Sequence, residues 1–335
     1  MTGPNGSVAD ADGYDWLPPT LRDDPQLRTA ADRIHRAAAR AFALWLRDAR
    51  RACLHQTTGD NADTGAEPAA LVVPPDPDAV AGTTATWQAA VQQVLLPPIS
   101  GLLTDRLSGL HATPDDTGGA AALLETYLPA VAARLADVPT TGYTRVLDLT
   151  AAAATTALAV GELRTMVDAA LRPAAWRSDV TTIARREALT AWQAATLSGW
   201  RATNAPGDAV AKEWVAVMDA RTRHSHAAAH GQRVPLDAPF TVGGYPMQHP
   251  GDPTAPTRET ANCRCDLLHV PATDPVLAAA STPSPDLSTA TGAPPHPKEP
   301  TMPPRATSTS VVAAASGADS GQPDRPRWSG LLAPI

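Results

Sequence analysis

The sequence predicts a mainly α N-terminal region, an elongated helical bundle, followed by a small α+β domain and a disordered Pro-rich tail. Three observations support this fold class. Apolar residues recur at helical spacing in residues 25–56 and through much of residues 83–202. The stretch from Trp214 to Val270 mixes strand-like runs with His and Cys. After Pro271 the composition changes to Pro, Ser, Thr and Ala with few bulky residues.

Composition narrows the class of protein further. The 335-residue chain has a net charge of -7, which argues against a nucleic-acid coat that works by bulk electrostatics. Aromatic residues make up only 4%, so we expect a core of Ala, Leu and Val. The 3 cysteines do not make a disulfide framework, and no apolar run is long enough to span a membrane. We interpret one group of arginines as solvated helix surface: Arg172, Arg177, Arg185, Arg186 and Arg201.

The first helix is predicted over residues 25–56. Asp24 suits a helix cap, Pro25 suits the first turn, and apolar residues follow at helical spacing on one face. Residues 1–24 lack periodicity and are expected to form a flexible arm. Residues 57–82 contain Gly, Asp and Pro-Pro and are expected to be a linker.

Residues 83–175 are predicted to be a helical region. Pro97-Pro98 predicts a kink or a break into two helices, because proline removes a backbone donor and clashes with the preceding turn. A helix from about Tyr143 to Val167 is expected to stop at Pro173. Another helix, about Asp179 to Ala202, opens the α+β domain predicted at 176–270, and the tail covers 271–335.

Within the α+β domain, Lys212 to Asp219 is typical of a short buried strand that includes Trp214 and Met218. A short helix follows, and Gly231 marks its end. On one helix, His226 and His230 would share a face. Side chains two apart in an extended chain point the same way, so the sulfurs of Cys263 and Cys265 would face one side.

These four side chains suit a zinc site, because zinc favours tetrahedral nitrogen and sulfur ligands. The predicted ligands are His226, His230, Cys263 and Cys265. The alternative is structural, with small buried cysteines and histidines that pack or cap. The C-x-C spacing departs from the usual C-x-x-C of zinc sites, and a disulfide across so short a loop would be strained.

The order of residues across this stretch resembles that of the phage Mu F-like minor head proteins. An acidic residue on the preceding helix is also typical of the family, and Glu187 fits that place. The resemblance covers about a third of the chain. It departs from the family where Met247-Gln248-His249 separates Tyr245-Pro246 from Pro250. The matching residues are Trp214, Asp219, Arg221, Thr222, Arg223, His226, His230, Gly231, Pro239, Phe240, Pro250, Gly251, Asp252, Pro253, Asn262, Cys263, Arg264 and Cys265.

The resemblance implies a minor capsid protein that acts in head morphogenesis of a tailed double-stranded DNA phage or prophage. Its expected partners are the portal protein and major capsid or scaffold subunits, with weak contact to packaged DNA and none to a membrane. Its expected place is the virion, in the head interior or at the portal vertex, after assembly in the bacterial host cytoplasm. We expect the turn after the strand to be fixed by Asp219 with Arg221 and Arg223, because a carboxylate accepts paired hydrogen bonds from Arg.

The alternative function is a metal-dependent hydrolase or toxin-like enzyme built on the His/Cys module, with Glu187 or Glu259 as base. The H-x-x-x-H spacing lacks the Glu that follows the first His in zinc proteases. No P-loop or G-x-S-x-G motif occurs in the sequence. We therefore predict no catalytic residues and a protein that is not an enzyme.

Overall fold

The computed structural model describes residues 14–56, 77–110, 117–156, 158–204 and 210–271. The chain divides into two units, Met1–Ala278 and Ala279–Ile335, and the second lies outside the described residues. The predicted tail, beyond residue 271, and most of the predicted linker, residues 57–76, also lie outside them.

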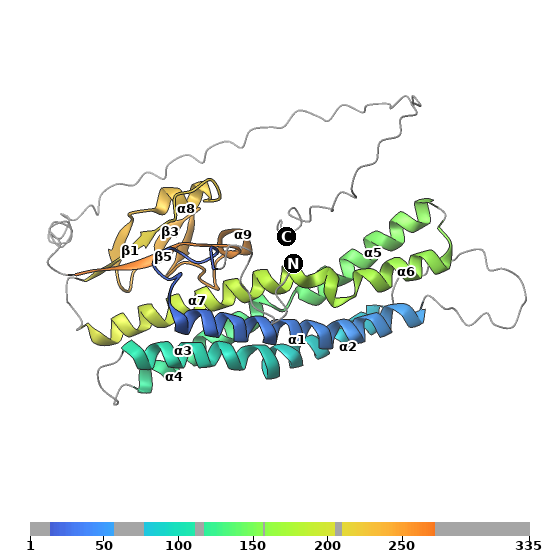
Figure 1. Cartoon of the computed structure of the whole chain (residues 1–335), viewed down its shortest axis with the longest axis horizontal. Coiled ribbons are helices and arrows are strands. Elements are labelled where there is room, and N and C mark those ends of the chain that lie inside the picture. Colours follow the sequence, from blue (N-terminus) through green and yellow to red (C-terminus); the bar gives the residue numbers. More distant parts are fainter. Residues whose placement is uncertain (1–13, 57–76, 111–116, 157, 205–209, 272–335) are drawn as a thin grey trace, which may run out of the picture. The chain divides into compact units, whose positions relative to one another are not determined.

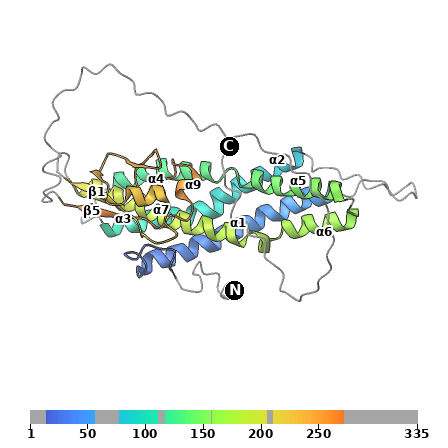
Figure 2. The same ribbon diagram turned by 90° about the horizontal axis from the view of Figure 1, so that it is seen from above.

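Helices form the N-terminal region, as the sequence predicts (Figure 1). Helix α1 lies beside α7, and α3 packs on α7 from another side (Figure 2). None of the described helices has the length and apolar character needed to cross a bilayer. The helical elements are α1 (Pro25–Gln56), α2 (Pro77–Ala90), the π-helical turn η1 (Val91–Leu95), α3 (Leu96–Leu110), α4 (Thr117–Arg134), α5 (Val138–Thr156), α6 (Val160–Ala170), the 3₁₀ turn η2 (Pro173–Trp176) and α7 (Arg177–Thr203).

Helix α1 begins where a carboxylate satisfies its free backbone donors. Asp24 Oδ1 accepts a hydrogen bond from the Leu27 amide at 2.9 Å, and Pro25 has no N–H to satisfy. The stripe that includes Leu27, Ile34 and Trp45 is buried in the bundle core. This helix therefore follows from its cap and its apolar period.

The prolines at 97 and 98 do not divide the chain into separate helices. The π-helical turn η1 joins α2 to α3, and both prolines lie in the first turn of α3. A π-helical turn shifts the backbone pairing by one residue, which accommodates residues that lack a donor. The single helix predicted from Tyr143 to Val167 is wrong, because the chain breaks between α5 and α6.

The predicted flexible arm is contradicted over its described part, residues 14–24. Trp16 and Leu17 are buried in the bundle core, so this segment gains the free energy of burying large apolar side chains. The Thr20 hydroxyl donates to Asp266 at the other end of the described chain. Residues 77–82, predicted as linker, are the start of α2.

The bundle core contains a cluster of rings despite the low aromatic content. Phe42, Trp45, Trp87 and Trp176 meet with ring centroids 5.0 to 6.0 Å apart. The Trp87 indole donates to the Leu135 carbonyl at 2.7 Å, so its polar atom is satisfied. The bundle core thus contains a ring cluster in addition to the expected Ala, Leu and Val.

The second core belongs to a small α+β module after α7. Its three-stranded antiparallel sheet has the order β2-β1-β5, with β1 (Ala211–Val215) in the centre, β2 (Arg233–Pro235) and β5 (Asp266–Val270). A hairpin pairs β3 (Phe240–Val242) with β4 (Tyr245–Met247), and two short helices, α8 (His224–Ala229) and α9 (Thr257–Thr260), complete the module.

Strand β1 is shorter than predicted. It ends at Val215, and Met218 is 55% exposed with a left-handed φ of 58°. The predicted strand to Asp219 is thus wrong beyond Val215, because the chain turns there toward α8.

Helix α7 contributes to both cores. Its buried apolar residues from Val180 to Ala195 belong to the bundle core, whereas Leu197 and Trp200 pack in the module. A domain boundary at residue 176, as predicted, would assign α7 to the α+β domain. Most of the buried apolar residues of α7 nevertheless pack in the bundle.

Gly142 on α5 allows a close approach to the ring cluster. A Cβ at this position would lie 2.5 Å from Trp45 Cη2, whereas a Cβ at Gly101 on α3 would meet nothing within 4 Å. We expect Gly142→Ala to lower the unfolding free energy by about 1–3 kcal/mol through overpacking. The control Gly101→Ala should raise it by about 0.5–1 kcal/mol, because alanine favours a helix over glycine. Urea denaturation measures both, and equal effects would contradict the packing argument.

Candidate functional site

Trp214 on the central strand organises the site. It is fully buried and meets the ring of Phe240 at 5.4 Å and that of His226 at 5.6 Å, both edge to face. Its carbonyl accepts a hydrogen bond from the Gly231 amide at 2.8 Å. Gly231 has a φ of 76°, which glycine adopts without strain, so the chain leaves α8 and returns to the sheet here.

Asp219 holds the turn between β1 and α8. Its carboxylate accepts hydrogen bonds from the Arg221 amide at 2.9 Å and from both terminal nitrogens of Arg264, one of them at 2.8 Å. The bonded Arg264 guanidinium holds the pKa of Asp219 well below its usual range. The prediction named Arg223 as a partner, but Arg223 donates to the Ala261 carbonyl instead. The Arg221 Nε lies 3.7 Å from the carboxylate, so Arg264 is the main cation here.

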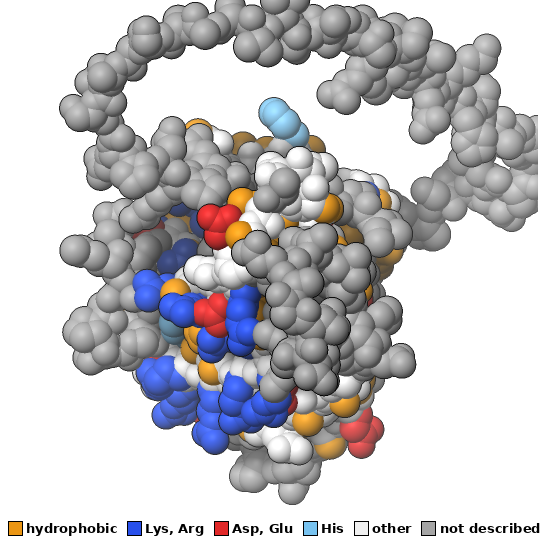
Figure 3. Space-filling view, turned by 90° about the vertical axis from the view of Figure 1, so that its right-hand side faces the viewer, with side chains coloured by type: hydrophobic (Ala, Val, Ile, Leu, Met, Phe, Trp, Pro, Cys, Tyr) orange, Lys and Arg blue, Asp and Glu red, His pale blue; other side chains and the backbone are white. Residues whose placement is uncertain are grey.

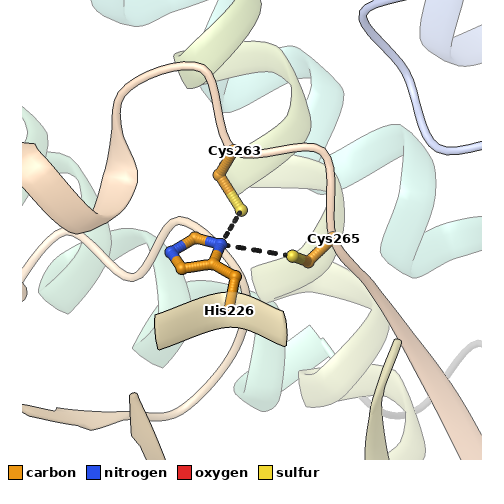
Figure 4. Close-up of side chains that lie close together, drawn as sticks. All are labelled: His226, Cys263 and Cys265. Atoms are coloured by element: carbon orange, nitrogen blue, oxygen red, sulfur yellow. Dashed lines mark hydrogen bonds between the residues drawn. The ribbon is translucent and has the colours of Figure 1, made fainter. Parts of the chain in front are cut away.

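Three of the four predicted metal ligands meet in the structure (Figure 4). The His226 Nδ1 lies 3.3 Å from the Cys265 Sγ and 3.7 Å from the Cys263 Sγ. His226 is on α8, whereas both cysteines lie on the segment that enters β5, and all three are buried. Both cysteines are free thiols.

His230 does not join this cluster, so the predicted four-residue set is wrong in one member. Helix α8 ends at Ala229, and His230 is exposed. Its Nδ1 accepts a hydrogen bond from the Ala216 amide at 3.2 Å. The helical face that His226 and His230 were expected to share therefore does not form.

The two thiols are electrostatically different. Hydrogen bonding to Cys265 and the nearby His226 lower the pKa of Cys263, although burial opposes this. The neighbouring Cys263 and burial raise the pKa of Cys265. The pair therefore favours one thiolate and one thiol.

A carboxylate lies on the other side of the imidazole ring. The Glu259 Oε2 is 3.4 Å from the His226 Nε2 and accepts a hydrogen bond from the Ser225 hydroxyl at 2.8 Å. Gly243 leaves room for it, since a Cβ there would lie 2.7 Å from the Glu259 Oε1. His226 thus has sulfur atoms beside one ring nitrogen and a carboxylate beside the other.

The Pro250-Gly251-Asp252 motif docks the module on α7. The Asp252 carboxylate accepts hydrogen bonds from the amides of Gln248 at 2.7 Å and Thr254 at 2.9 Å, which closes the loop. Gly251 has a φ of 77°, and a Cβ there would clash with the Thr190 hydroxyl on α7. Gly251 is therefore needed for the close contact with α7, and Asp252 is needed to close the loop.

Glu187 lies at the centre of a buried ion cluster. Its carboxylate binds Arg134 of α4 at 2.5 Å and Arg186 at 2.9 Å, and its side chain is 0% exposed. Burial alone would raise the pKa of Glu187, but Arg134 and Arg186 outweigh burial and lower the pKa below 4.5. Its stabilising contribution is thus present above the unfolded-state pKa and is lost as the pH falls through the folded-state value.

Sequence reasoning missed Lys212 and Arg134. Lys212 is fully buried in β1, and its ammonium donates to the Gln248 carbonyl at 2.9 Å. Burial lowers the pKa of Lys212 to about 7. Arg134 binds Glu187 and also reaches toward the Gly251 carbonyl at 3.5 Å. A Lys at a strand position whose side chain is buried is a signal only once the strand register is known, whereas Arg134 looks like an ordinary helix end.

Asn262 and Phe240, the other predicted motif residues, have structural roles. Asn262 adopts a left-handed φ of 53°, which asparagine tolerates better than most residues, directly before Cys263. Phe240 is fully buried against Trp214. Thr222 donates from its hydroxyl to Asp219 at 3.2 Å and so supports the turn.

Comparison with known proteins identifies this region. Residues 150–268 match the family model described as Phage Mu protein F like protein. The chain carries a phage Mu F-like region. This match supports a phage head morphogenesis protein, and it includes the C-terminal end of α5, all of α6 and α7, and nearly the whole module. The Mu F-like region thus begins well before the predicted boundary at residue 176.

A second comparison finds an NAD(+)--arginine ADP-ribosyltransferase EFV of Enterococcus faecalis, which is 32% identical over 88 residues. The match covers 26% of this chain and 18% of that protein, so the chain spans less than a fifth of the relative's length. No solved structure matches the chain.

The ion cluster gives a direct test of how the Mu F-like region is held together. We expect Glu187→Gln to lower the unfolding free energy by about 3–5 kcal/mol, because Arg134 and Arg186 would remain buried without a counter-charge. Thermal or urea unfolding at neutral pH measures the change. As a control, Asp23→Asn removes the exposed partner of Arg28 and should have little effect. A Glu187→Gln protein as stable as the parent would contradict the assigned role of this carboxylate.

Proposed function

We propose that this protein is a portal-associated minor capsid protein that acts in head assembly and in DNA packaging or ejection. We place it in the virion, in the head interior or at the portal vertex. The match of residues 150–268 to the Mu F-like family is the observation that carries this proposal. Portal, major capsid and scaffold subunits are the proposed partners.

The construction of the module supports a binding role. Its loop 248–254 rests on α7, and its strand β5 bonds to α7 through Gln193 and Asp266 at 2.7 Å. These contacts hold the module in a fixed position on the helices that would contact other head subunits. A module tied to its support in this way suits a brace between subunits.

A basic face on the helices supports contact with packaged DNA. We define it by exposed arginines on one side of α1 and on or just after α6: Arg33, Arg36, Arg40, Arg47, Arg51, Arg164 and Arg172. Figure 3 shows Lys and Arg side chains gathered on the side of the molecule where α1 ends and α6 lies. Arg50 of α1 and Arg172 both bind Asp168, at 3.0 and 2.8 Å, so the two parts of the face adjoin.

Most of this face is uncompensated within the described residues. Arg33, Arg36, Arg40 and Arg164 form no ion pair with any described carboxylate. Free guanidinium groups bind phosphates well, and phosphate contacts carry most non-specific affinity for DNA. Because the whole chain is acidic, we expect this contact to be weak and strongly dependent on salt.

The basic face differs from the group of five arginines interpreted from the sequence as solvated helix surface. Arg186 is buried against Glu187, Arg185 lies over Trp16, and Arg201 binds the Leu236 carbonyl at 2.8 Å. Arg172, Arg177 and Arg201 are the exposed members of that group. The face instead takes most of its charge from α1.

An enzyme built on the module is the second candidate, and the similarity to an ADP-ribosyltransferase is the observation that favours it. The aligned part is a small share of that relative. Glu187, one candidate base, is neutralised by two arginines, and Glu259, the other, is engaged with Ser225 and His226. We therefore propose a protein that is not an enzyme.

The proposed place in the particle has a direct test. We expect the chain to co-sediment with proheads that contain the portal and to be found by mass spectrometry in purified virions. Proheads assembled without the portal are the control and should carry much less of it. Equal recovery from both would contradict portal association, and absence from virions would contradict the proposed function.

The basic face is tested separately by binding to duplex DNA. Neutralising one phosphate changes the slope of log affinity against log salt by about 0.9. We expect Arg40→Ala to weaken binding and reduce this slope by about 1, as measured by fluorescence anisotropy. Arg221→Ala removes an exposed arginine of the module and should leave the slope unchanged. Equal slopes for the parent and Arg40→Ala would contradict DNA contact through this face.

A further inference from the structure

We propose that His226, Cys263 and Cys265 bind one zinc ion, with a water molecule as the fourth ligand. The proposal does not depend on the function in the phage head. It concerns the only group of metal-ligating side chains of this kind among the described residues. Two thiolates and one imidazole suit zinc, whereas magnesium and calcium prefer oxygen ligands.

The distances fit a tetrahedral ion. Zinc–nitrogen bonds of about 2.0 Å and zinc–sulfur bonds of about 2.3 Å put nitrogen and sulfur about 3.5 Å apart at the tetrahedral angle. The His226 Nδ1 lies 3.3 Å and 3.7 Å from the two sulfurs, on either side of this value. All three ligand atoms lie within 4.8 Å of one another. The two nitrogen–sulfur distances therefore fit a tetrahedral ion to within a few tenths of an ångström.

The backbone holds both sulfurs on one side. Asn262 turns the chain in a left-handed conformation, and the extended residues that follow place alternate side chains on opposite sides. Arg264, between the cysteines, points to Asp219 and is 12% exposed. The ion pair of Arg264 thereby fixes the direction in which Cys263 and Cys265 face His226.

The histidine has the outer partner that a metal ligand needs. Zinc-bound histidines donate their other ring N–H to a carboxylate or carbonyl, which fixes the ring and makes the ligand more basic. Glu259 is 3.4 Å from the His226 Nε2, and this nitrogen is buried without any other hydrogen-bond partner among the described residues. With zinc on Nδ1, the proton is placed on Nε2, and it faces this carboxylate.

The fourth position faces a small pocket beside the sulfurs. The pocket has a volume of about 10 Å³ and is lined by Thr222, Arg223 and Asn262 together with the three ligands. This is roughly the space of one water molecule. None of its described lining residues is Asp or Glu, and Glu259 lies on the far side of the imidazole. A bound water would thus lack a general base, so the zinc ties α8 to the segment before β5 and performs no hydrolysis.

Binding is coupled to proton release. Both sulfurs must be thiolates to bind zinc, so any proton held by the cysteine pair is released to the solvent. Two thiolates then balance the charge of Zn²⁺, which leaves no net charge in the buried cluster.

The test is a zinc titration of the full chain after removal of metal with a chelator. We expect one zinc per chain by elemental analysis and a higher melting temperature with zinc than without it. Cobalt in place of zinc should give the absorption bands of a tetrahedral thiolate site. This spectrum reports the ligands directly and needs no variant.

Variants then assign the ligands. His226→Gln and Cys265→Ser should lose the stoichiometric zinc, whereas Cys53→Ser, which removes the buried free thiol of α1, should keep it. His230→Gln should also keep it. Glu259→Gln should retain one zinc but bind it about 10–100-fold more weakly, as expected for an outer partner.

Several results would overturn the proposal. These are a parent chain with no stoichiometric zinc and the same melting temperature in chelator, or a cobalt form without thiolate bands. Loss of zinc in His230→Gln with retention in Cys265→Ser would also overturn it. If His226→Gln or Cys265→Ser fails to fold, the cobalt spectrum of the parent chain still decides.

Discussion

The structure depends on a polar stripe along α7. Glu187, Thr190 and Gln193 follow one another at helical spacing and are all buried. Glu187 binds Arg134 of α4, Thr190 contacts Gly251 of the loop before α9, and Gln193 binds Asp266 of β5. Buried polar groups are costly unless each finds its partner, so this stripe accepts only one placement of the module. Apolar contacts supply much of the burial, whereas the stripe determines which surfaces meet.

Much of the helical region could be predicted from the sequence because its signals are local. Helix α1 has its cap at Asp24, directly before its first residue, and its apolar residues repeat every three or four positions. Both signals can be read from neighbouring residues. The ring cluster was missed because its members come from α1, α2 and η2, and composition alone does not reveal that a few rings gather. The break between α5 and α6 occurs in an Ala-rich run without a strong stop residue.

In the site, local patterns predicted the orientation of the two cysteines, but they missed the orientation of His230 and the partner of Asp219. The C-x-C spacing correctly placed both sulfurs on one side, because an extended chain alternates. The prediction that His226 and His230 share a helix face is wrong, because the chain after Ala229 pairs with the sheet instead of continuing the helix. The Gly231 amide bonds to the Trp214 carbonyl, and the Gln232 carbonyl accepts from the Trp214 amide at 3.0 Å. Pairing with β1 thus ends α8 before it reaches His230.

The partner of Asp219 could not be found from a local pattern. Arg264, which binds this carboxylate, lies 45 residues later in the chain.

The contact between the segment before α1 and strand β5 has a consequence for how the protein is made. Thr20 bonds to Asp266, a partner 246 residues later in the chain. On the ribosome, which delivers the N-terminus first, this contact cannot form until β5 has emerged. A nascent chain therefore carries Thr20 without this partner through most of its synthesis. The contact between Thr20 and β5 is thus formed late, and only in chains that have been translated through the cysteine segment.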